Sequence, residues 1–462
     1  MSGANLEPLS GFRDFMPRES IFRQGVIMRV REVFEGYGFV PLETPAAERP
    51  EVLEGKYGEE GTKLIFRILR RGSELDSSFM SLHETQRAGE RHFADLQGLS
   101  DMALRYDLTV PLARVVARNI SELSWPFKRY QIAPVWRADK PGEGRFREFY
   151  QCDVDTVGSS SMSADAEFVL IISDTLRAVG FDDFFIRINN RKILDGLMER
   201  FDVVADQRLR ALQLIDKLDK VNPAQVIAEM VEDGIDSSIT DAIIGVIVSM
   251  GNFDPESQLA ELANEIGDTA TGAAGLSELA EVFSYLQPLG LPADRVRLDV
   301  SMARGLDYYT GTIYETVLRN APDVGSVMSG GRFDELVGMF AGRDIPAVGV
   351  SLGLDRLFSV MERSGMVPAK QTTAEVLVAC LGEACMPYAM AVAQRYRGAG
   401  IATLLYTNPI EGAGRQIGYA KRLGIPLVAI VGGEEMANNT VTVKNMEDRT
   451  QCSVRFDELP TV

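Results

Sequence analysis

Residues 128–155 read KRYQIAPVWRADKPGEGRFREFYQCDVD and predict an antiparallel β-hairpin. Residues 130–136 are apolar enough to form a buried strand, and residues 146–154 have the composition of a second strand. Between them, residues 141–144 contain a proline and two glycines, which are typical of a turn. The hairpin is therefore expected to have two paired strands and a mobile tip.

Cationic side chains are concentrated in and beside this hairpin. They are Lys128, Arg129, Arg137, Lys140, Arg145 and Arg147. Guanidinium groups in a partly dry cleft bind phosphate strongly, because each bidentate pair is charge-assisted and geometrically specific. With the aromatic Phe149 close by, the pattern favours a polyphosphate site with ATP as its ligand. A solvated basic hairpin is the alternative.

The composition favours a soluble globular protein of several domains. The chain has 462 residues, which corresponds to two to four domains at about 150 residues each. It is 45% hydrophobic and 25% charged, and it contains no uninterrupted apolar run of about 18 residues. Because its start has no basic leader before an apolar segment, a cytoplasmic location without membrane contact is expected. A net charge of −18 argues against non-specific coating of nucleic acid, but it permits binding of one RNA through local basic faces.

Nucleotide binding in this chain cannot use the common phosphate loop. Residues 55–63, GKYGEEGTK, resemble such a loop superficially, but the GxxxxGK[ST] pattern is absent from the whole sequence. The two histidines, His83 and His92, lie in a polar segment at residues 72–100 that we interpret as a surface loop or helix. Any ATP chemistry is therefore expected to use another phosphate-binding fold and no histidine base.

A carboxylate and a hydroxyl are expected side by side ahead of the hairpin. Residues 104–111, LRYDLTVP, predict a short strand that runs into a helix started by Pro111. Because side chains alternate along a strand, Asp107 and Thr109 would point to one face and suit an ammonium group, which has three donors. An N-terminal helix cap explains Thr109 equally well.

The N-terminal region predicts a helix followed by an edge strand. Residues 18–38 place apolar side chains largely at helical spacing and contain two terminal glycines. Residues 39–45, FVPLETP, predict a strand whose two prolines exclude it from the middle of a sheet. This pair of elements suits either a dimer contact or ordinary packing.

A second dense group of polar motifs begins near Val296. Residues 304–309 place an arginine in a turn before two adjacent tyrosines, Tyr308 and Tyr309. Burying the polar atoms of this arginine and these tyrosines without hydrogen-bond partners would cost free energy, so a polar ligand is expected there. Tyr314, further along the same run, is expected to pack in the core.

Glycine-containing motifs follow this second group. Residues 329–334, SGGRFD, supply glycines that let the backbone approach a ligand closely. Residues 349–357 predict a strand that passes through glycine into a helix, and the first turn of that helix presents Arg356. Residues 329–334 are therefore expected to border a ligand.

Two further regions have a different character. Residues 191–292 are acidic and rich in alanine, leucine and isoleucine, and they predict an inserted helical domain. Residues 374–462 alternate short apolar strands with helices, which indicates an open α/β sheet covered on both faces. With neither a GxGxxG fingerprint nor a nucleophile elbow, this last region is expected to be a binding module.

These elements resemble a class II aminoacyl-tRNA synthetase, and specifically the histidyl-tRNA synthetase family. The helix and strand ending at Pro45 resemble the first class motif, the hairpin resembles the second, and residues 349–357 resemble the third. The runs that resemble histidine-specific elements are RGLDYYTG at residues 304–311, SGGRFDELV at residues 329–337 and LRYDLTVP at residues 104–111.

The resemblance implies an α/β fold with three parts. The first is an α+β catalytic domain, residues 1–190 and 293–368, built on a mostly antiparallel six-stranded sheet flanked by helices. The second is a helical insertion at residues 191–292, and the third is an open α/β anticodon-binding domain at residues 374–462.

The resemblance also implies an activity and partners. The expected enzyme activates L-histidine with ATP, releases pyrophosphate, and transfers the histidyl group to the 3′ end of tRNA(His) as a homodimer. Mg²⁺ is expected between the phosphates, with no protein ligand assigned. A basic helix face formed by Arg415, Lys421 and Arg422 suits either tRNA or solvent. The alternative function is a non-catalytic, synthetase-like regulatory subunit of histidine biosynthesis.

The resemblance implies site residues one by one. Those expected at ATP are Arg137, Asp139, Arg145, Arg147, Phe149 and Arg356. Those expected at histidine are Asp107, Thr109, Arg137, Gln151, Asp155, Arg304, Tyr308 and Tyr309. Arg137 and Arg304 are the expected catalytic residues, because they would stabilise charge at the α-phosphate. Asp139 and Asp155 stand where many relatives have glutamate, so each reaches one methylene less far.

Overall fold

The structure is a computed structural model of the chain. It describes residues 5–54, 63–87, 98–142, 144–251, 254–292, 294–303 and 308–460. Arg304, His92 and residues 55–62 of the loop-like stretch therefore lie outside the described residues. Contacts divide the chain into two compact units, which are Met1–Arg13 with Ile27–Val360, and Asp14–Val26 with Met361–Val462. The three predicted domains stay predictions.

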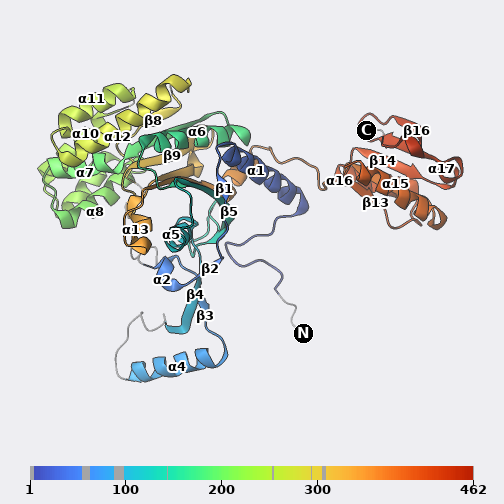
Figure 1. Cartoon of the computed structure of the whole chain (residues 1–462), viewed down its shortest axis with the longest axis horizontal. Helices are drawn as coiled ribbons and strands as arrows, with labels where there is room; N and C mark the ends of the chain where they lie inside the picture. Colours follow the sequence, from blue (N-terminus) through green and yellow to red (C-terminus); the bar gives the residue numbers. More distant parts are fainter. Residues whose placement is uncertain are drawn as a thin grey trace. The chain divides into compact units, whose positions relative to one another are not determined.

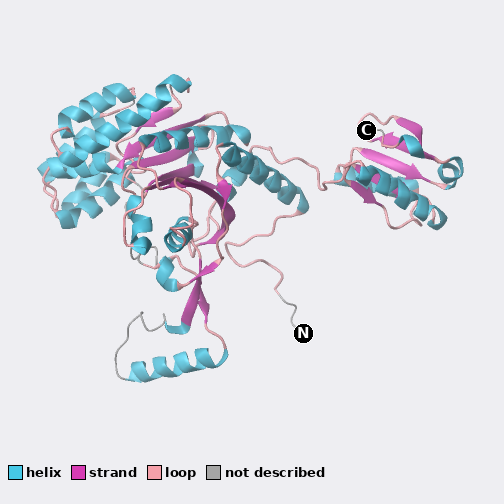
Figure 2. Cartoon of the chain, viewed as in Figure 1, coloured by secondary structure: helices cyan, strands magenta, loops and turns pink. Residues whose placement is uncertain are grey.

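The first unit is built on an eight-stranded sheet with the strand order β1-β5-β6-β11-β10-β9-β7-β8. Figure 2 draws the strands in magenta, with helices packed around them. The strands are β1 Val40–Pro41, β5 Phe127–Trp136, β6 Glu148–Val157, β7 Phe184–Asn190, β8 Val296–Leu298, β9 Thr312–Leu318, β10 Ser326–Arg332 and β11 Ala347–Gly353, with the short 3₁₀ helix η4 Pro322–Val324 after β9. The middle strands pair antiparallel, whereas β1 and β8 join the two edges in parallel. The predicted α/β fold with a mostly antiparallel sheet is confirmed.

The expected number of six strands is wrong, because two short strands extend the sheet at its edges. β1 has two residues and β8 has three, so neither is long enough to reveal a strand by alternation of its side chains. β1 includes Pro41, which an edge position tolerates because one side of an edge strand needs no backbone donor. The predicted edge placement of residues 39–45 is confirmed.

The predicted hairpin is confirmed as β5 and β6. Its register runs from Phe127 opposite Val157 to Trp136 opposite Glu148, so the two strands pair over their whole length. The turn residues lie between them, at the free end of the hairpin. The hairpin therefore lies one strand in from the β1 edge of the sheet, and its tip follows the last pair, Trp136 with Glu148.

Helices cover both faces of this sheet (Figure 1). They are α1 Pro17–Gly36, α5 Thr109–Arg118, α6 Met162–Ala178, α13 Asp334–Ala341 and α14 Leu354–Arg363, whereas the short helix α2 Pro50–Leu53 packs against α5. Leu112 of α5, Val337 of α13 and Val157 of β6 belong to one buried core. Because side chains alternate along β6, Asp153 and Asp155 point to the same face of the sheet as Val157. The core under α5 and α13 therefore borders two carboxylates.

A separate three-stranded sheet precedes α5. Its strands are β2 Ala47–Glu48, β3 Arg67–Leu69 and β4 Ser100–Leu104, and helix α4 Gly72–Arg87 follows β3. The strand predicted over residues 104–111 is wrong, because β4 ends at Leu104 and α5 begins at Thr109. Asp107 lies in the connection, and its Oδ1 accepts from the Val110 amide at 3.3 Å. The carboxylate thus satisfies a backbone donor of the first helical turn, which ends the extended conformation.

Within the described residues, six α-helices lie between β7 and β8. They are α7 Arg191–Arg200, α8 Ala205–Ile215, α9 Pro223–Glu232, α10 Ser237–Ser249, α11 Pro255–Ile266 and α12 Ala270–Leu286, with the 3₁₀ helices η2 Asp216–Asp219 and η3 Gln287–Leu289. The Asn222 side chain caps α9 and precedes Pro223, so the turn signal at this point marks a helix start. α7 and α12 approach closely, since an added Cβ at Gly196 would lie 2.6 Å from Gly272 Cα.

The second unit contains a five-stranded sheet with the order β13-β12-β14-β15-β16. Its elements are β12 Val376–Cys380, η5 Glu383–Cys385, α15 Met386–Gly398, β13 Thr403–Leu405, α16 Ala413–Leu423, β14 Leu427–Val431, α17 Gly433–Asn438, β15 Thr440–Asn445, β16 Gln451–Arg455 and η6 Phe456–Glu458. Val376 and Val378 of β12 belong to the core with α15, whereas Leu377 and Ala379 belong to the core with α16. The predicted open α/β sheet covered on both faces is confirmed.

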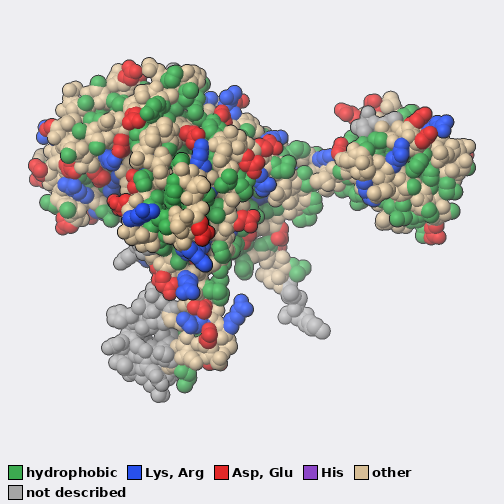
Figure 3. Space-filling view, viewed as in Figure 1, with side chains coloured by type: hydrophobic (Ala, Val, Ile, Leu, Met, Phe, Trp, Pro, Cys, Tyr) green, Lys and Arg blue, Asp and Glu red, His purple; other side chains and the backbone are tan. Residues whose placement is uncertain are grey.

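Charged side chains of both signs are spread over the face of the molecule that Figure 3 shows. On that face, acidic and basic groups are intermixed and neither sign forms one large separate patch. Among the described residues, no helix has the length and the apolar character needed to cross a membrane.

Candidate active site

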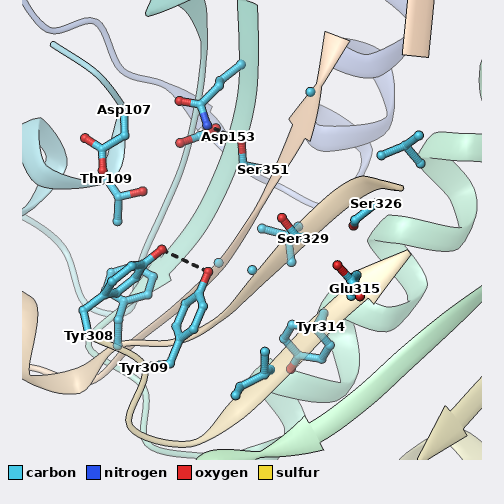
Figure 4. A pocket seen from close by; sticks show the side chains of 18 of the residues that line it. Asp107, Thr109, Asp153, Tyr308, Tyr309, Tyr314, Glu315, Ser326, Ser329 and Ser351 are labelled. Atoms are coloured by element: carbon cyan, nitrogen blue, oxygen red, sulfur yellow. Dashed lines mark hydrogen bonds between the residues drawn. The ribbon is translucent and has the colours of Figure 1, made fainter. Parts of the chain in front are cut away.

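A cavity of about 540 Å³ opens on the face of the large sheet that carries Asp153 and Asp155. Its lining comes from the connection before α5, the β5–β6 hairpin, strands β9 to β11, the start of α14 and the end of α8. Figure 4 shows the side chains of Asp107, Thr109 and Tyr308 around the same space. Segments far apart in the sequence therefore build one site.

Nine predicted site residues line this cavity. They are Asp107, Thr109, Arg137, Phe149, Gln151, Asp155, Tyr308, Tyr309 and Arg356. The other predicted residues in the described part of the chain, Asp139, Arg145 and Arg147, lie on the hairpin tip and do not line it. Arg304 lies outside the described residues, so its role stays a prediction.

Arg137 and Phe149 form the end of the cavity nearest the hairpin tip. The guanidinium carbon of Arg137 lies 5.2 Å from the centroid of the Phe149 ring. Arg137 Nε donates to the carbonyl oxygen of Tyr106 at 2.9 Å, which fixes the orientation of the guanidinium plane. A fixed guanidinium beside an aromatic face suits a ligand that has both a phosphate and a flat ring.

The two arginines of the hairpin tip, Arg145 and Arg147, lie outside the cavity lining. Arg147 Nε donates to the carbonyl oxygen of Asp139 at 3.1 Å, and its Nη1 donates to that of Ser10 at 3.3 Å. Arg145 is exposed to solvent. Arg356, in the first turn of α14, does line the cavity. Arg137 and Arg356 are therefore the arginines already in place for an anionic ligand.

Carboxylates gather at the other end of β6. Asp155 Oδ2 lies 2.7 Å from Nη2 of the fully buried Arg129 on β5, and Asp153 lies opposite Ser351 of β11. Burial raises the pKa of the Asp153 carboxyl, the nearby Asp155 raises it further, and Arg129 opposes both effects. Burial also raises the pKa of Asp155. Arg129 lowers this pKa, and Asp107 raises it. Three acids beside one buried guanidinium favour a cationic ligand group.

Two glycines make room for the polar side chains of the site. An added Cβ at Gly349 would lie 2.0 Å from Asp155 Oδ1, and one at Gly331 would lie 2.9 Å from the Tyr309 ring. A side chain at either position would have to displace these groups. The glycines of residues 329–334 thus leave room for the Tyr309 ring. The sequence predicted only that they would let the backbone approach a ligand.

Two adjacent tyrosines meet through their hydroxyls in the cavity (Figure 4). Tyr308 donates to the Tyr309 hydroxyl at 3.0 Å, and the two ring centroids lie 4.3 Å apart. Burial raises the pKa of Tyr309, and Tyr308 and the nearby carboxylates raise it further, so this hydroxyl keeps its proton and can donate it to a ligand. Tyr314 is buried as predicted, and its hydroxyl donates to the carbonyl oxygen of Asp165 at 2.9 Å.

Sequence reasoning missed other residues that line the cavity. Among them are Gln213, Asp216 and Glu315, whereas Ser329 and Ser351 lie within the glycine-containing motifs and Asp153 was assigned no role at the ligand. Alternation could have identified Asp153, because it lies two residues before Asp155 on one strand and must share its face. Gln213 and Asp216 come from α8 and η2, where no local pattern distinguishes them from other polar helix residues.

Replacing Asp153 with asparagine is expected to stabilise the fold at alkaline pH. A raised pKa means that the folded protein holds this proton more tightly than the unfolded chain does. The group therefore favours folding at low pH, and this contribution is lost as the pH rises through the folded-state pKa. Since asparagine has no charge to bury, calorimetry should show a Tm raised by a few degrees near pH 8 and by less near pH 5.

The control for this experiment is Asp101→Asn on β4, because Asp101 is exposed. Its Tm should match that of the unmodified protein at both pH values. An equal loss of Tm at both pH values for Asp153→Asn would show that the effect on stability does not depend on the titration of this carboxyl, which contradicts the expectation.

Known proteins match this chain over nearly its whole length. The profile of the histidyl-tRNA synthetase family matches residues 73–357, and that of the anticodon binding domain matches residues 375–462. A protein of Cytophaga hutchinsonii named histidine–tRNA ligase is 38% identical over 450 residues, which cover 97% of each chain. One of Gloeobacter violaceus with the same name is 40% identical over 468 residues, which cover 96% of each.

A solved structure gives the same result for the fold. The crystal structure of histidyl-tRNA synthetase from Nostoc sp. PCC 7120 has a TM-score of 0.83 to this chain, at 34% identity and with 98% of both chains covered. The predicted motifs supply residues to one cavity, and the relatives match in both sequence and fold. The chain therefore belongs to the histidyl-tRNA synthetase family.

Proposed function

We propose that this chain is a histidine–tRNA ligase. It activates L-histidine with ATP to form histidyl-adenylate and pyrophosphate, and it then transfers the histidyl group to the 3′ end of tRNA(His). The observation that carries this proposal is one cavity that combines Arg137 and Phe149 with Asp155 and the hydroxyl pair of Tyr308 and Tyr309. Phe149 and Asp155 are six residues apart on β6, about 20 Å along an extended strand, which gives room for two substrates end to end.

The tip end of the cavity would hold ATP. Arg137 would bind the α-phosphate together with the carboxylate of histidine, and Phe149 would stack under adenine. The other proposed ATP ligands are Asp139, Arg145, Arg147 and Arg356. Because Arg145 and Arg147 lie on the tip, the proposal requires the tip to close over the phosphates.

The inner end of the cavity would hold histidine. The proposed ligands of its ammonium group are Asp107, Thr109 and Gln151. Asp155 and Tyr309 would bind the two ring nitrogens, with Tyr308 orienting Tyr309 through the bond between their hydroxyls. The pairing with Arg129 holds the short Asp155 side chain in place. A site that bonds both polar ring atoms can reject analogues that lack them by about 10⁴–10⁵.

The activation step needs positioning and charge stabilisation more than proton transfer. A carboxylate oxygen of histidine forms a bond to the α-phosphorus, and the bond from that phosphorus to the departing pyrophosphate oxygen breaks. Because two anions must meet, Arg137 and Arg304 would act by holding them together and stabilising the developing charge. Mg²⁺ would neutralise the phosphates, as it usually does with few protein ligands. In the described part of the chain, no group of three or more His, Cys, Asp or Glu side chains is arranged to hold a metal ion.

The remaining parts of the proposal concern domains and partners. The catalytic domain would comprise residues 1–190 and 293–368, the insertion residues 191–292, and the anticodon-binding domain residues 374–462; the anticodon-domain match supports the last of these. A cytoplasmic homodimer is proposed, and the exposed Val40 on edge strand β1 supports a contact there. The regulatory alternative has less support, because the relatives matched over nearly their whole length are named histidine–tRNA ligases.

Pyrophosphate exchange tests the proposed function directly. The purified protein is expected to exchange labelled pyrophosphate into ATP when histidine is present, and to load histidine onto tRNA(His). Reactions with each of the other standard amino acids serve as controls and should stay at background. Exchange with a different amino acid, or no exchange with histidine, would overturn the assignment.

A further inference from the structure

The N-terminal strap, residues 9–13, is packed against the hairpin tip and the start of α14. It does not line the cavity, and no motif discussed above includes it. We propose that Gly11 and Arg13 are positioning residues of the ATP site, which hold the base of the tip and the start of α14 so that Arg137 and Arg356, the arginines that line the cavity, converge on one polyphosphate. This inference rests on the proposed function.

Backbone hydrogen bonds tie the strap to the hairpin. The Arg147 amide donates to the Gly11 carbonyl oxygen at 2.8 Å, and the Arg147 carbonyl accepts from the Arg137 amide at 2.9 Å. Arg147 is thus hydrogen-bonded through its backbone to Arg137 on one side and to the strap on the other. Since Arg137 lines the cavity, a shift of Gly11 would pass through Arg147 to a residue that contacts ATP in the proposed function.

Gly11 has no room for a side chain at this contact. Its φ of +85° lies in the left-handed region that favours glycine. An added Cβ would lie 2.8 Å from Cγ of Arg147 and 3.0 Å from Cγ of Pro141, which are the two ends of the tip. The strap therefore packs directly against the tip. The backbone conformation and the close packing both require glycine at position 11.

Arg13 joins three elements of the site. Its Nη2 lies 2.8 Å from Asp355 Oδ1, and its guanidinium carbon lies 3.9 Å from the centroid of the Phe146 ring on the tip. The second oxygen of Asp355 accepts from the Tyr150 amide at 2.7 Å, at the start of β6. Asp355 immediately precedes Arg356 in α14, and its side chain is 3% exposed. One carboxylate and one guanidinium therefore fix the start of α14, the start of β6 and the tip together.

These contacts surround the nucleotide end of the cavity and leave the histidine end untouched. Arg13 reaches Phe146 and Asp355, whereas Asp155 is paired with Arg129. Asp155 and Tyr309 pack against Gly349 and Gly331, which the strap contacts do not involve. Loss of the strap contacts should therefore weaken ATP use and leave histidine recognition intact. Ordinary packing would affect stability, or both substrates equally.

Kinetics of the full-length Arg13→Ala variant test this inference. We expect the KM for ATP in pyrophosphate exchange to rise about 10-fold to 100-fold, because misplacing catalytic groups by about 1 Å can cost 10²-fold. The KM for histidine should stay within about 2-fold of the original value. Arg13→Lys should restore part of the loss, since a lysine keeps the charge for Asp355 but lacks the flat guanidinium that covers Phe146. The matched control is Arg18→Ala, because Arg18 does not line the cavity and its guanidinium hydrogen-bonds the carbonyl oxygens of Pro368 and Val367.

Three results separate this inference from its competitors. An equal rise in both KM values, or a lower Tm with unchanged KM values, would overturn the positioning role of Arg13. If Arg13→Ala does not fold, Arg13→Lys gives the same test, because it keeps a charge for Asp355 and removes only the guanidinium that covers Phe146. Failure of the unmodified protein to catalyse histidine-dependent exchange would instead refute the proposed function, so the two failures are distinguishable.

Discussion

Arg137→Ala is expected to lower the rate of histidine-dependent pyrophosphate exchange by about 10³-fold. Arg137 is proposed to contact both reacting groups, the α-phosphate and the histidine carboxylate. Its guanidinium is already oriented by the bond from Nε to the Tyr106 carbonyl oxygen and by the Phe149 ring. Removing it takes away one of the two cations proposed to hold the reacting anions together, so both the KM for ATP and kcat should be affected.

Arg137→Lys distinguishes geometry from charge. A lysine ammonium keeps the positive charge, but it cannot bond the Tyr106 carbonyl oxygen and also bridge two oxyanions in a fixed plane. We therefore expect its rate to lie closer to that of Arg137→Ala than to that of the unmodified protein. Arg177→Ala is the control, because the Arg177 side chain is 62% exposed on α6 and is paired with Asp182. A rate within about 10-fold of the original for Arg137→Ala would contradict the proposed role.

The hairpin and the composition of the site were predictable because local patterns mark them. Proline and glycine in residues 141–144 punctuate two apolar runs, and the β5–β6 pairing follows from that pattern. The residue types of the cavity, arginine with an aromatic ring and aspartate with tyrosine, could be chosen from the motifs alone. Their convergence was inferred from the family resemblance, and the fold supplies the contacts that hold them.

Other features depend on contacts that no local pattern shows. Arg147 has the same motif context as Arg145, yet its guanidinium bonds the Ser10 carbonyl oxygen, 137 positions away in the sequence. Asp107 and Thr109 line the cavity as predicted, but they follow from a helix start instead of a strand. The sequence permits either a strand or a helix start at this point. In the structure the helix start is formed, and the Val110 amide donates to Asp107.

Gly349→Ala is expected to raise the KM for histidine about 100-fold while leaving the KM for ATP nearly unchanged. The added methyl carbon would lie 2.0 Å from Asp155 Oδ1 and 2.8 Å from the Val154 carbonyl oxygen. Since the backbone oxygen is fixed within the β6–β11 pairing, the Asp155 carboxylate must move. No charge is removed, so Arg129 keeps a carboxylate nearby, and the main loss is the geometry toward the imidazole ring.

A double-variant comparison shows whether the methyl group acts through Asp155. If it does, Gly349→Ala combined with Asp155→Ala should have about the same histidine KM as Asp155→Ala alone, because the displaced group is already gone. Gly245→Ala on α10 is the control, since an added Cβ there would meet no atom within 4 Å. Losses that simply multiply in the double variant would mean that Gly349 supports histidine binding by another route, such as the backbone of β11. A rise in the KM for ATP equal to that for histidine would instead indicate a general distortion of the sheet. It would mean that Gly349 has no specific role in recognition of the imidazole ring.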